Sequence, residues 1–166
     1  MCVVYDFDQV IYERRFTGLS VTTKVYLCDR GIVSEFLVSD LDYDFYFYCE
    51  PVLGVNKEET YRFLRFKYIS EVNCLIISNC YSEDFGDKVV VIWSSAPIES
   101  LTTSKDEFVG AIHSLSSPYI FKNKSIVSLS GKLVDGEPCC VALKLKPAQD
   151  NFKIIKFALS EEELDL

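Results

Sequence analysis

Residues 19–39 read LSVTTKVYLCDRGIVSEFLVS, and this stretch decides the fold class. From residue 19 to residue 27, leucine, valine and one threonine on one face alternate with polar side chains on the other, which is the period of an extended strand. Asp29-Arg30-Gly31 then offers a turn in which Gly31 is able to adopt a positive φ. A second run, residues 32–39, returns from this turn, so the stretch predicts a β-hairpin.

Short runs rich in β-branched and aromatic residues predict further strands along the chain. These runs are residues 44–49, 74–80, 88–93 and 152–159. The run 88–93 is apolar on both faces, which indicates a central strand.

Asp135-Gly136 is a strong hairpin signal near the C-terminus. We therefore expect residues 125–133 and residues 139–146 to pair as its two arms. In the second arm, one face should carry Cys139, Val141, Leu143 and Leu145. Lys144 and Lys146 are then expected to face out.

Two capping boxes predict short helices. Ser104 precedes Glu107 by three residues, and the helix that begins there would bury one apolar stripe. That stripe contains Phe108, Ala111, Ile112 and Leu115. Ser160 and Glu163 have the same spacing and predict a short C-terminal helix. Residues 57–68 fit a helix in their first turn and a strand afterwards.

Hairpins with one or two short helices, and without regular β-α-β alternation, predict an α+β domain. We expect a predominantly antiparallel β-sheet of the sandwich or barrel type. The chain has 166 residues, which fits a single domain. That domain should span residues 1–159, and residues 160–166 should form a short acidic tail or the start of a helix.

The net charge is −8 and the pI is near 4.7. Because an acidic protein repels phosphate backbones, these values favour a protein partner over a nucleic acid. The N-terminus lacks the pattern of a signal peptide, and no stretch is long enough to span a bilayer. We therefore expect a cytoplasmic or nuclear protein with no membrane partner.

The seven cysteines are odd in number and irregular in spacing, which indicates reduced thiols rather than disulfides. No Cys-x-x-Cys pair occurs, and His113 is the one histidine. A zinc site and a Cys–His nucleophile both lack their usual signals. We expect no metal site and no cofactor.

Residues 3–11 read VVYDFDQVI, an apolar strand followed by Asp6 and Asp8. This pattern resembles the first motif of the haloacid dehalogenase-like phosphotransferases. The resemblance implies that Asp6 is the nucleophile and Asp8 the general acid and base, with Mg²⁺ as cofactor. Gln9-Val10 stand where that family has Gly-Thr, and its later lysine and acidic pair are missing. A divergent Mg²⁺-dependent phosphotransferase is therefore an alternative function.

Residues 57–68 interleave cations with aromatic side chains in an otherwise acidic chain. The candidate binding residues are Lys57, Tyr61, Arg62, Arg65 and Lys67. Such a patch can bind an acidic or phosphorylated peptide, or stack on RNA bases and hold their phosphates. The pattern can also be explained without a ligand, by a strand whose aromatic side chains enter the core while its cations stay in water.

The aromatic content of 14% exceeds what a core of this size needs, and aromatic residues are enriched in the cores of protein interfaces. The sequence therefore favours a non-catalytic intracellular protein–protein interaction domain, an adaptor or a subunit of a larger complex. Its partners would be other proteins, including any with an acidic or phosphorylated segment. An RNA-binding module that uses residues 57–68 is the second alternative, after the phosphotransferase.

Overall fold

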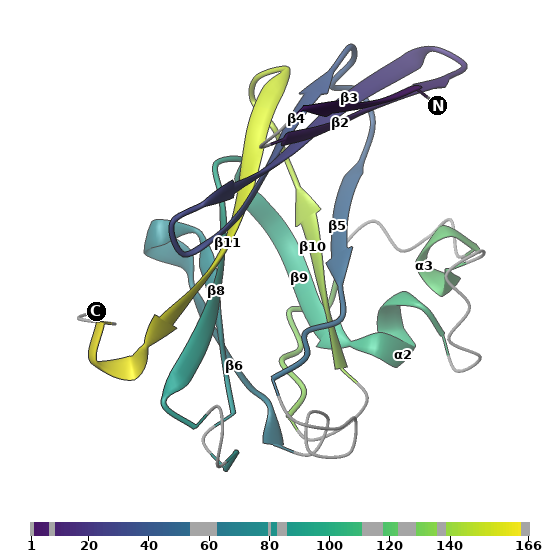
Figure 1. Ribbon diagram of the computed structural model, residues 1–166. Coiled ribbons are helices and arrows are strands. Elements are labelled where there is room, and N and C mark those ends of the chain that lie inside the picture. Colours follow the sequence, from purple (N-terminus) through teal and green to yellow (C-terminus); the bar gives the residue numbers. More distant parts are fainter. Residues whose placement is uncertain are drawn as a thin grey trace.

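Two antiparallel sheets form the body of the protein in the computed structural model (Figure 1). The structure describes residues 2–6, 9–53, 63–79, 81–82, 86–110, 118–122, 129–135 and 139–163. The prediction of a mainly antiparallel β domain with short helices is confirmed.

The larger sheet has eight strands. In spatial order they are β1 (Cys2–Asp6), β2 (Gln9–Phe16), β3 (Leu19–Cys28), β4 (Gly31–Val38), β11 (Asn151–Ser160), β8 (Lys88–Ser94), β7 (Cys74–Ser78) and β6 (Arg65–Ile69). The smaller sheet has the order β5 (Phe45–Cys49), β10 (Cys139–Leu145) and β9 (Ile98–Ser104). Helical turns are η1 (Ser70–Val72), α2 (Lys105–Phe108), α3 (Tyr119–Lys122) and η2 (Glu161–Glu163).

The hairpin predicted for residues 19–39 is confirmed, because β3 and β4 pair across a two-residue turn, with Cys28 opposite Gly31. The role expected for Gly31 is wrong: the described glycines with positive φ are Gly18, Gly110 and Gly131. Gly31 is needed for close approach instead. A Cβ atom on it would lie 2.0 Å from the carbonyl oxygen of Lys156 in the neighbouring strand β11.

The main core lies between the two sheets. The inner faces of β6, β7, β8, β11 and β4 pack against β9, β10 and β5. Its fully buried members include Leu75, Ile92, Leu143 and Ile154. Strand β8 lies between β11 and β7, which confirms the central position predicted for residues 88–93.

A second core lies on the far face of the small sheet, where α2 and α3 form a third layer (Figure 1). Phe108, Val109 and Ile120 pack there against Cys140 and Ala142 of β10. Strand β10 is therefore buried on both faces along its whole length. The outward position predicted for Lys144 is wrong, since its side chain is 4% exposed, whereas Lys146 is exposed as predicted.

The hairpin predicted for residues 125–146 is wrong. Strand β10 pairs with β5 and β9, and residues 129–135 form no strand. These residues run beside β9 instead: Gly131 N donates to Leu101 O at 2.9 Å, and Thr103 N donates to Lys132 O at 3.0 Å. Residues 125–128 and 136–138, which include Gly136, lie outside the described residues.

Both helical turns begin at the predicted capping boxes, and one of the two reciprocal hydrogen bonds forms in each. The Glu107 amide donates to Ser104 Oγ at 3.4 Å, and α2 begins there. The helix is shorter than predicted, since it ends at Phe108 and Gly110 follows with φ +91°. Residues 111–117, with the rest of the predicted stripe, lie outside the described residues. At the C-terminus, the Ser160 amide donates to Glu163 Oε2 at 3.0 Å, and η2 begins there.

Within the described part of the chain, no helix is long and apolar enough to cross a membrane.

Replacing Gly31 by alanine is expected to lower the free energy of unfolding by about 1–3 kcal/mol, because the added methyl group overpacks the contact with β11. Denaturant unfolding followed by circular dichroism measures the change. The control is Val52→Ala, at a side chain that is 76% exposed, which should change stability by less than about 0.5 kcal/mol. Equal stabilities of the Gly31→Ala variant and the unmodified protein would contradict the close approach.

Candidate interaction surfaces

The structure describes Arg65 and Lys67 among the predicted binding residues, whereas Lys57, Tyr61 and Arg62 lie outside the described residues. Both described cations are on β6, at one edge of the large sheet.

Arg65 is engaged in contacts within the domain. Its Nε atom lies 3.8 Å from Asp135 Oδ2. Its guanidinium carbon is 5.9 Å from the ring centre of Tyr81, and that ring lies 5.2 Å from the ring of Phe63. Arg65 therefore joins the edge of the large sheet to the segment beside β9.

Lys67 is exposed, and it lies opposite Ile76 in the register of β6 and β7. On the other face of β6, Phe66 is buried and Tyr68 packs against the main core. In this half of the predicted patch, the aromatic side chains serve the core and the cations lie at the surface. This alternation matches the explanation of residues 57–68 as a strand with aromatic side chains in the core and cations in water.

Asp6 ends strand β1, which is the other edge of the large sheet, and lies opposite Gln9 in the register of β1 and β2. Asp8 lies outside the described residues. The resemblance to the phosphotransferases implies a parallel strand that leads into a helix, but here the chain turns back as an antiparallel strand. The fold that this resemblance implies is therefore not found in the described chain.

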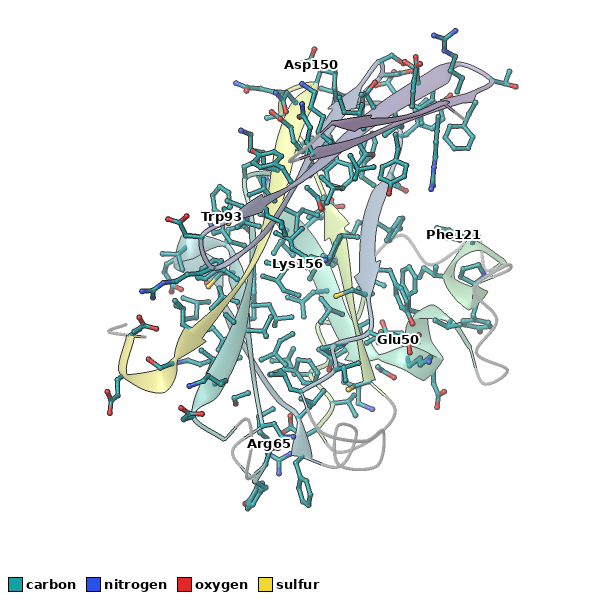
Figure 2. The ribbon with its side chains drawn as sticks, viewed as in Figure 1. Glu50, Arg65, Trp93, Phe121, Asp150 and Lys156 are labelled. Atoms are coloured by element: carbon teal, nitrogen blue, oxygen red, sulfur yellow. The ribbon has the colours of Figure 1, made fainter. Side chains whose placement is uncertain are left out.

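The face of the large sheet that points away from the small sheet is called here the outer face. One row of register-paired residues crosses it over six strands. Its members are Tyr26, Val33, Ile155, Trp93, Cys74 and Ile69. A second row joins Phe157, Val91 and Ile76. Figure 2 shows Trp93 on this side of the sheet, whereas Lys156, the next residue after Ile155, lies between the two sheets.

Large side chains shield small ones on the outer face. Val33, Val91 and Cys74 are 4–5% exposed, although no layer of the described chain packs on this side of the sheet. Trp93 and Phe157, which flank them, are half-buried. An open sheet face would normally alternate with polar residues, so this face is unusually apolar.

Lysines lie around these rows. Lys24 and Lys67 are exposed. Lys153 lies 3.5 Å from Glu35, and Asn151 donates to the same carboxylate at 3.1 Å. The hydrogen bond from Asn151 and the charge of Lys153 hold the pKa of Glu35 below its usual value. Lys24, Lys67 and Lys153 thus lie near the apolar rows, together with Glu35.

A groove of about 440 Å³ lies between the inner face of the N-terminal strands and β5. It is lined by Arg14, Phe16, Val21, Thr23, Phe36, Phe45, Tyr46, Phe47, Tyr48, Leu145, Phe152 and Ile154. The rings of Phe36 and Phe152 stack at 5.1 Å, and Phe45 meets Phe152 edge-on at 5.7 Å. The groove is therefore aromatic, and Arg14 is the one charged side chain among the described residues that line it.

Lys144 lies between two carboxylates on the far face of the small sheet. Its Nζ atom is 3.1 Å from Asp44 Oδ1 and 3.0 Å from Glu99 Oε2. Burial disfavours the charged amine, but the hydrogen bonds to both carboxylates outweigh it and raise the pKa of Lys144. The arrangement neutralises a buried cation.

Glu50 also forms an ion pair with a lysine, and it accepts a hydrogen bond as well. It accepts a hydrogen bond from Tyr48 at 2.7 Å and pairs with Lys105 at 2.8 Å. Burial and the hydrogen bond to Glu50 raise the pKa of Tyr48 far above its usual value. The carboxylates of Asp44, Glu99 and Glu50 thus all form ion pairs within the domain.

Five cysteines have free thiols in the structure, namely Cys28, Cys49, Cys74, Cys139 and Cys140. Burial raises the pKa of Cys49 and Cys139 to about 11, so both are protonated and weakly nucleophilic at neutral pH. Among the described residues, no cluster of histidine, cysteine and carboxylate side chains could hold a metal ion.

The sequence model of one family, described as glycosyl hydrolase 94, supersandwich domain, matches residues 40–150, about two thirds of the chain. The chain belongs to this family. A supersandwich domain of this kind is a non-catalytic β-sandwich module, which is compatible with the prediction of a non-catalytic domain. No curated protein matches the sequence.

Glycoside hydrolysis requires two carboxyl groups on either side of the scissile bond, one of which donates a proton. In this supersandwich domain, Asp44 and Glu99 face each other across Lys144, and the cation occupies the space between them. This pair is therefore arranged to hold a lysine rather than a substrate.

Sequence reasoning missed the outer face and the groove. The apolar character of residues 88–93 on both faces was a signal for the outer face, and it indicated only a central strand. The groove had no local signal, because its lining comes from β2, β3, β4, β5, β10 and β11.

Replacing Lys144 by alanine is expected to lower the free energy of unfolding by about 2 kcal/mol, because it leaves two like charges facing each other. The loss should lie below the roughly 3–5 kcal/mol of a fully buried pair, since Asp44 and Glu99 are partly in water. Chemical denaturation at pH 7 measures it. The matched control is Lys146→Ala, two residues along and exposed, and a similar loss in both variants would contradict the assignment.

Asp6→Asn is expected to leave the rate of phosphate-ester cleavage unchanged, because Asp6 is on an edge strand of an antiparallel sheet. A chromogenic phosphate ester with Mg²⁺ measures the rate in both proteins. Turnover by the unmodified protein that disappears in Asp6→Asn would restore the phosphotransferase alternative.

Proposed function

We propose that this supersandwich domain is a non-catalytic protein-interaction module that docks on another protein through its outer face. The observation that carries the proposal is the apolar row from Tyr26 to Ile69, which crosses six strands without a polar residue.

The energetic reason is the cost of leaving such a face in water. Burial of apolar surface stabilises by roughly 25 cal/mol per Å², and a large apolar patch on a soluble protein usually marks an interaction site. Trp93 and Phe157 are half-buried, so part of their surface is still available to a partner. Tryptophan is among the residues most often responsible for binding energy at interfaces.

The charges around the face favour an acidic partner. Lys24 and Lys67 are exposed on it, while the domain as a whole carries a net charge of −8. Complementary charges steer association and suppress wrong partners. A protein surface with an apolar centre and acidic surroundings fits these features, and an adaptor or complex subunit in the cytoplasm or nucleus would present this face to it.

RNA binding has less support. The sequence-based case depended on aromatic side chains that stack on bases. Of the three described in residues 57–68, Phe66 and Tyr68 pack in the core, and half-buried Phe63 packs against the ring of Tyr81. A stacking platform needs exposed rings.

The double variant Lys24→Glu, Lys67→Glu is expected to lose partner binding while its melting temperature stays unchanged, because exposed charges contribute little to stability. The matched control is Lys132→Glu, Lys146→Glu, which makes the same change in net charge at exposed positions outside the outer face.

The measurement has two stages. Proteins captured from an extract of the source organism are compared between the unmodified protein and both variants, and the candidate partner is then purified and titrated. We expect the outer-face variant to raise the Kd at least tenfold, which is about 1.4 kcal/mol, and the control variant to bind normally. Equal binding by both variants would refute docking on the outer face.

A further inference from the structure

The small sheet ends at β5, and the structure describes no strand beyond it. One edge of β5 pairs with β10, from Phe45 opposite Leu145 to Cys49 opposite Val141. At the other end of this sheet, residues 129–135 form backbone hydrogen bonds to the outer edge of β9. An edge strand exposes a row of unpaired amide and carbonyl groups, which is a template for pairing with another chain.

The groove runs along this free edge. Side chains on β5 alternate: Phe45 and Phe47 pack against the main core, and Tyr46 and Tyr48 pack against the second core. All four residues line the groove. A groove that touches consecutive residues of one strand follows the edge of its backbone, rather than one of its faces.

The large sheet extends beyond the small one at this place. Figure 1 shows β2, β3 and β4 crossing above the upper ends of β5 and β10. On the inner face of these strands, Phe16 is 59% exposed, and Val21 and Phe36 are only partly buried. The inner face of the sandwich is therefore incompletely covered beside β5.

We propose that the free edge of β5 accepts an extended segment of a partner polypeptide as an additional strand of the small sheet. Neighbouring strands lie about 4.8 Å apart and packed sheets about 10 Å apart. A strand added beside β5 would thus run through the groove, facing the inner side of β2 and β3. This surface is separate from the outer face, and the inference does not depend on docking there.

The lining defines the chemistry of the segment. Alternate side chains of an added strand point the same way, so those that enter the groove should be apolar to match Phe16, Phe36 and Phe45. One inward position should carry a carboxylate, because Arg14 is the charged residue of the lining. Main-chain hydrogen bonds would supply affinity and these side chains specificity, as in other cases of strand addition.

An oligosaccharide is the competing occupant, since aromatic rings line the groove. Its many hydroxyl groups would need polar partners, because buried polar groups must be hydrogen-bonded. Among the described lining residues, Arg14 and Thr23 offer polar side chains, while Tyr46 and Tyr48 direct their side chains to the second core. An extended peptide bonds to the backbone of β5 instead and places apolar side chains against the rings. The chemistry therefore favours the peptide.

The first test selects peptides from a displayed library of nonapeptides with fully varied sequence. We expect enriched sequences to alternate apolar and polar residues, with an aspartate or glutamate at one inward position, and to bind as synthetic, terminally blocked peptides. Methylation of the amide nitrogens that face β5 should weaken binding at least tenfold, because it removes main-chain donors and keeps every side chain. Binding should also slow hydrogen exchange of the amides in β5.

Two variants locate the site. Phe16→Ser should weaken the selected peptide at least fivefold. Its matched control is Tyr81→Ser, at a ring that is 63% exposed and is not part of the groove lining. Arg14→Glu should weaken binding by a similar factor, and exchange of the peptide's carboxylate for lysine should restore it in that variant.

The inference is overturned by any of three results: no peptide is enriched, amide methylation has no effect, or Phe16→Ser and Tyr81→Ser have equal effects. Binding of a soluble oligosaccharide mixture in the groove, with loss of binding in Phe16→Ser and no peptide selected, would assign the groove to a carbohydrate instead. Retained melting temperatures in all variants establish that each result reports on binding.

Discussion

Burial of β10 on both faces is the constraint on which the rest of the structure depends. Every residue from Cys139 to Leu145 is buried, so the strand needs an apolar layer on each side. The inner face of the large sheet supplies one layer, and α2 with α3 supplies the other. The order of the layers follows from this single strand, because neither the large sheet nor the short helices could cover it alone.

The cost of such a strand appears at Lys144. A buried lysine must keep its charge neutralised, and Asp44 and Glu99 do so from positions before β5 and within β9. The ion pairs thereby fix how the two outer strands of the small sheet meet the central one. Asp44 and Glu99 are therefore part of this structural requirement.

Local patterns in the sequence were sufficient for much of the fold. The alternation in residues 19–39 predicted β3 and β4, and the Ser104–Glu107 spacing predicted the start of α2, because both signals arise from neighbouring residues. The failures are non-local. Asp135-Gly136 suggested a hairpin, but the partners of β10 are β5 and β9, which are distant in the sequence. Lys144 looked exposed because no local pattern shows that helices cover that face.

The candidate surfaces also divide into features that local patterns predict and features that depend on residues distant in the sequence. Residues 65–68 were correctly described by the alternation of cations and aromatics, which is local. The outer face and the groove exist only after strands from both halves of the chain align, as with Ile155 beside both Val33 and Trp93. A single sequence gives the period of each strand but not the register between strands, so these surfaces could not be predicted from it.

The position of β11 has a consequence for biosynthesis. This strand is inserted between β4 and β8, so residues 151–160 join two parts of the sheet that leave the ribosome much earlier. Until they emerge, β4 and β8 each present an open edge, and such edges favour intermolecular pairing and aggregation. Contacts between residues so far apart in the chain also slow folding. The sheet can therefore be completed only after residues 151–160 have been synthesised, and until then its two parts keep the edges that β11 will join.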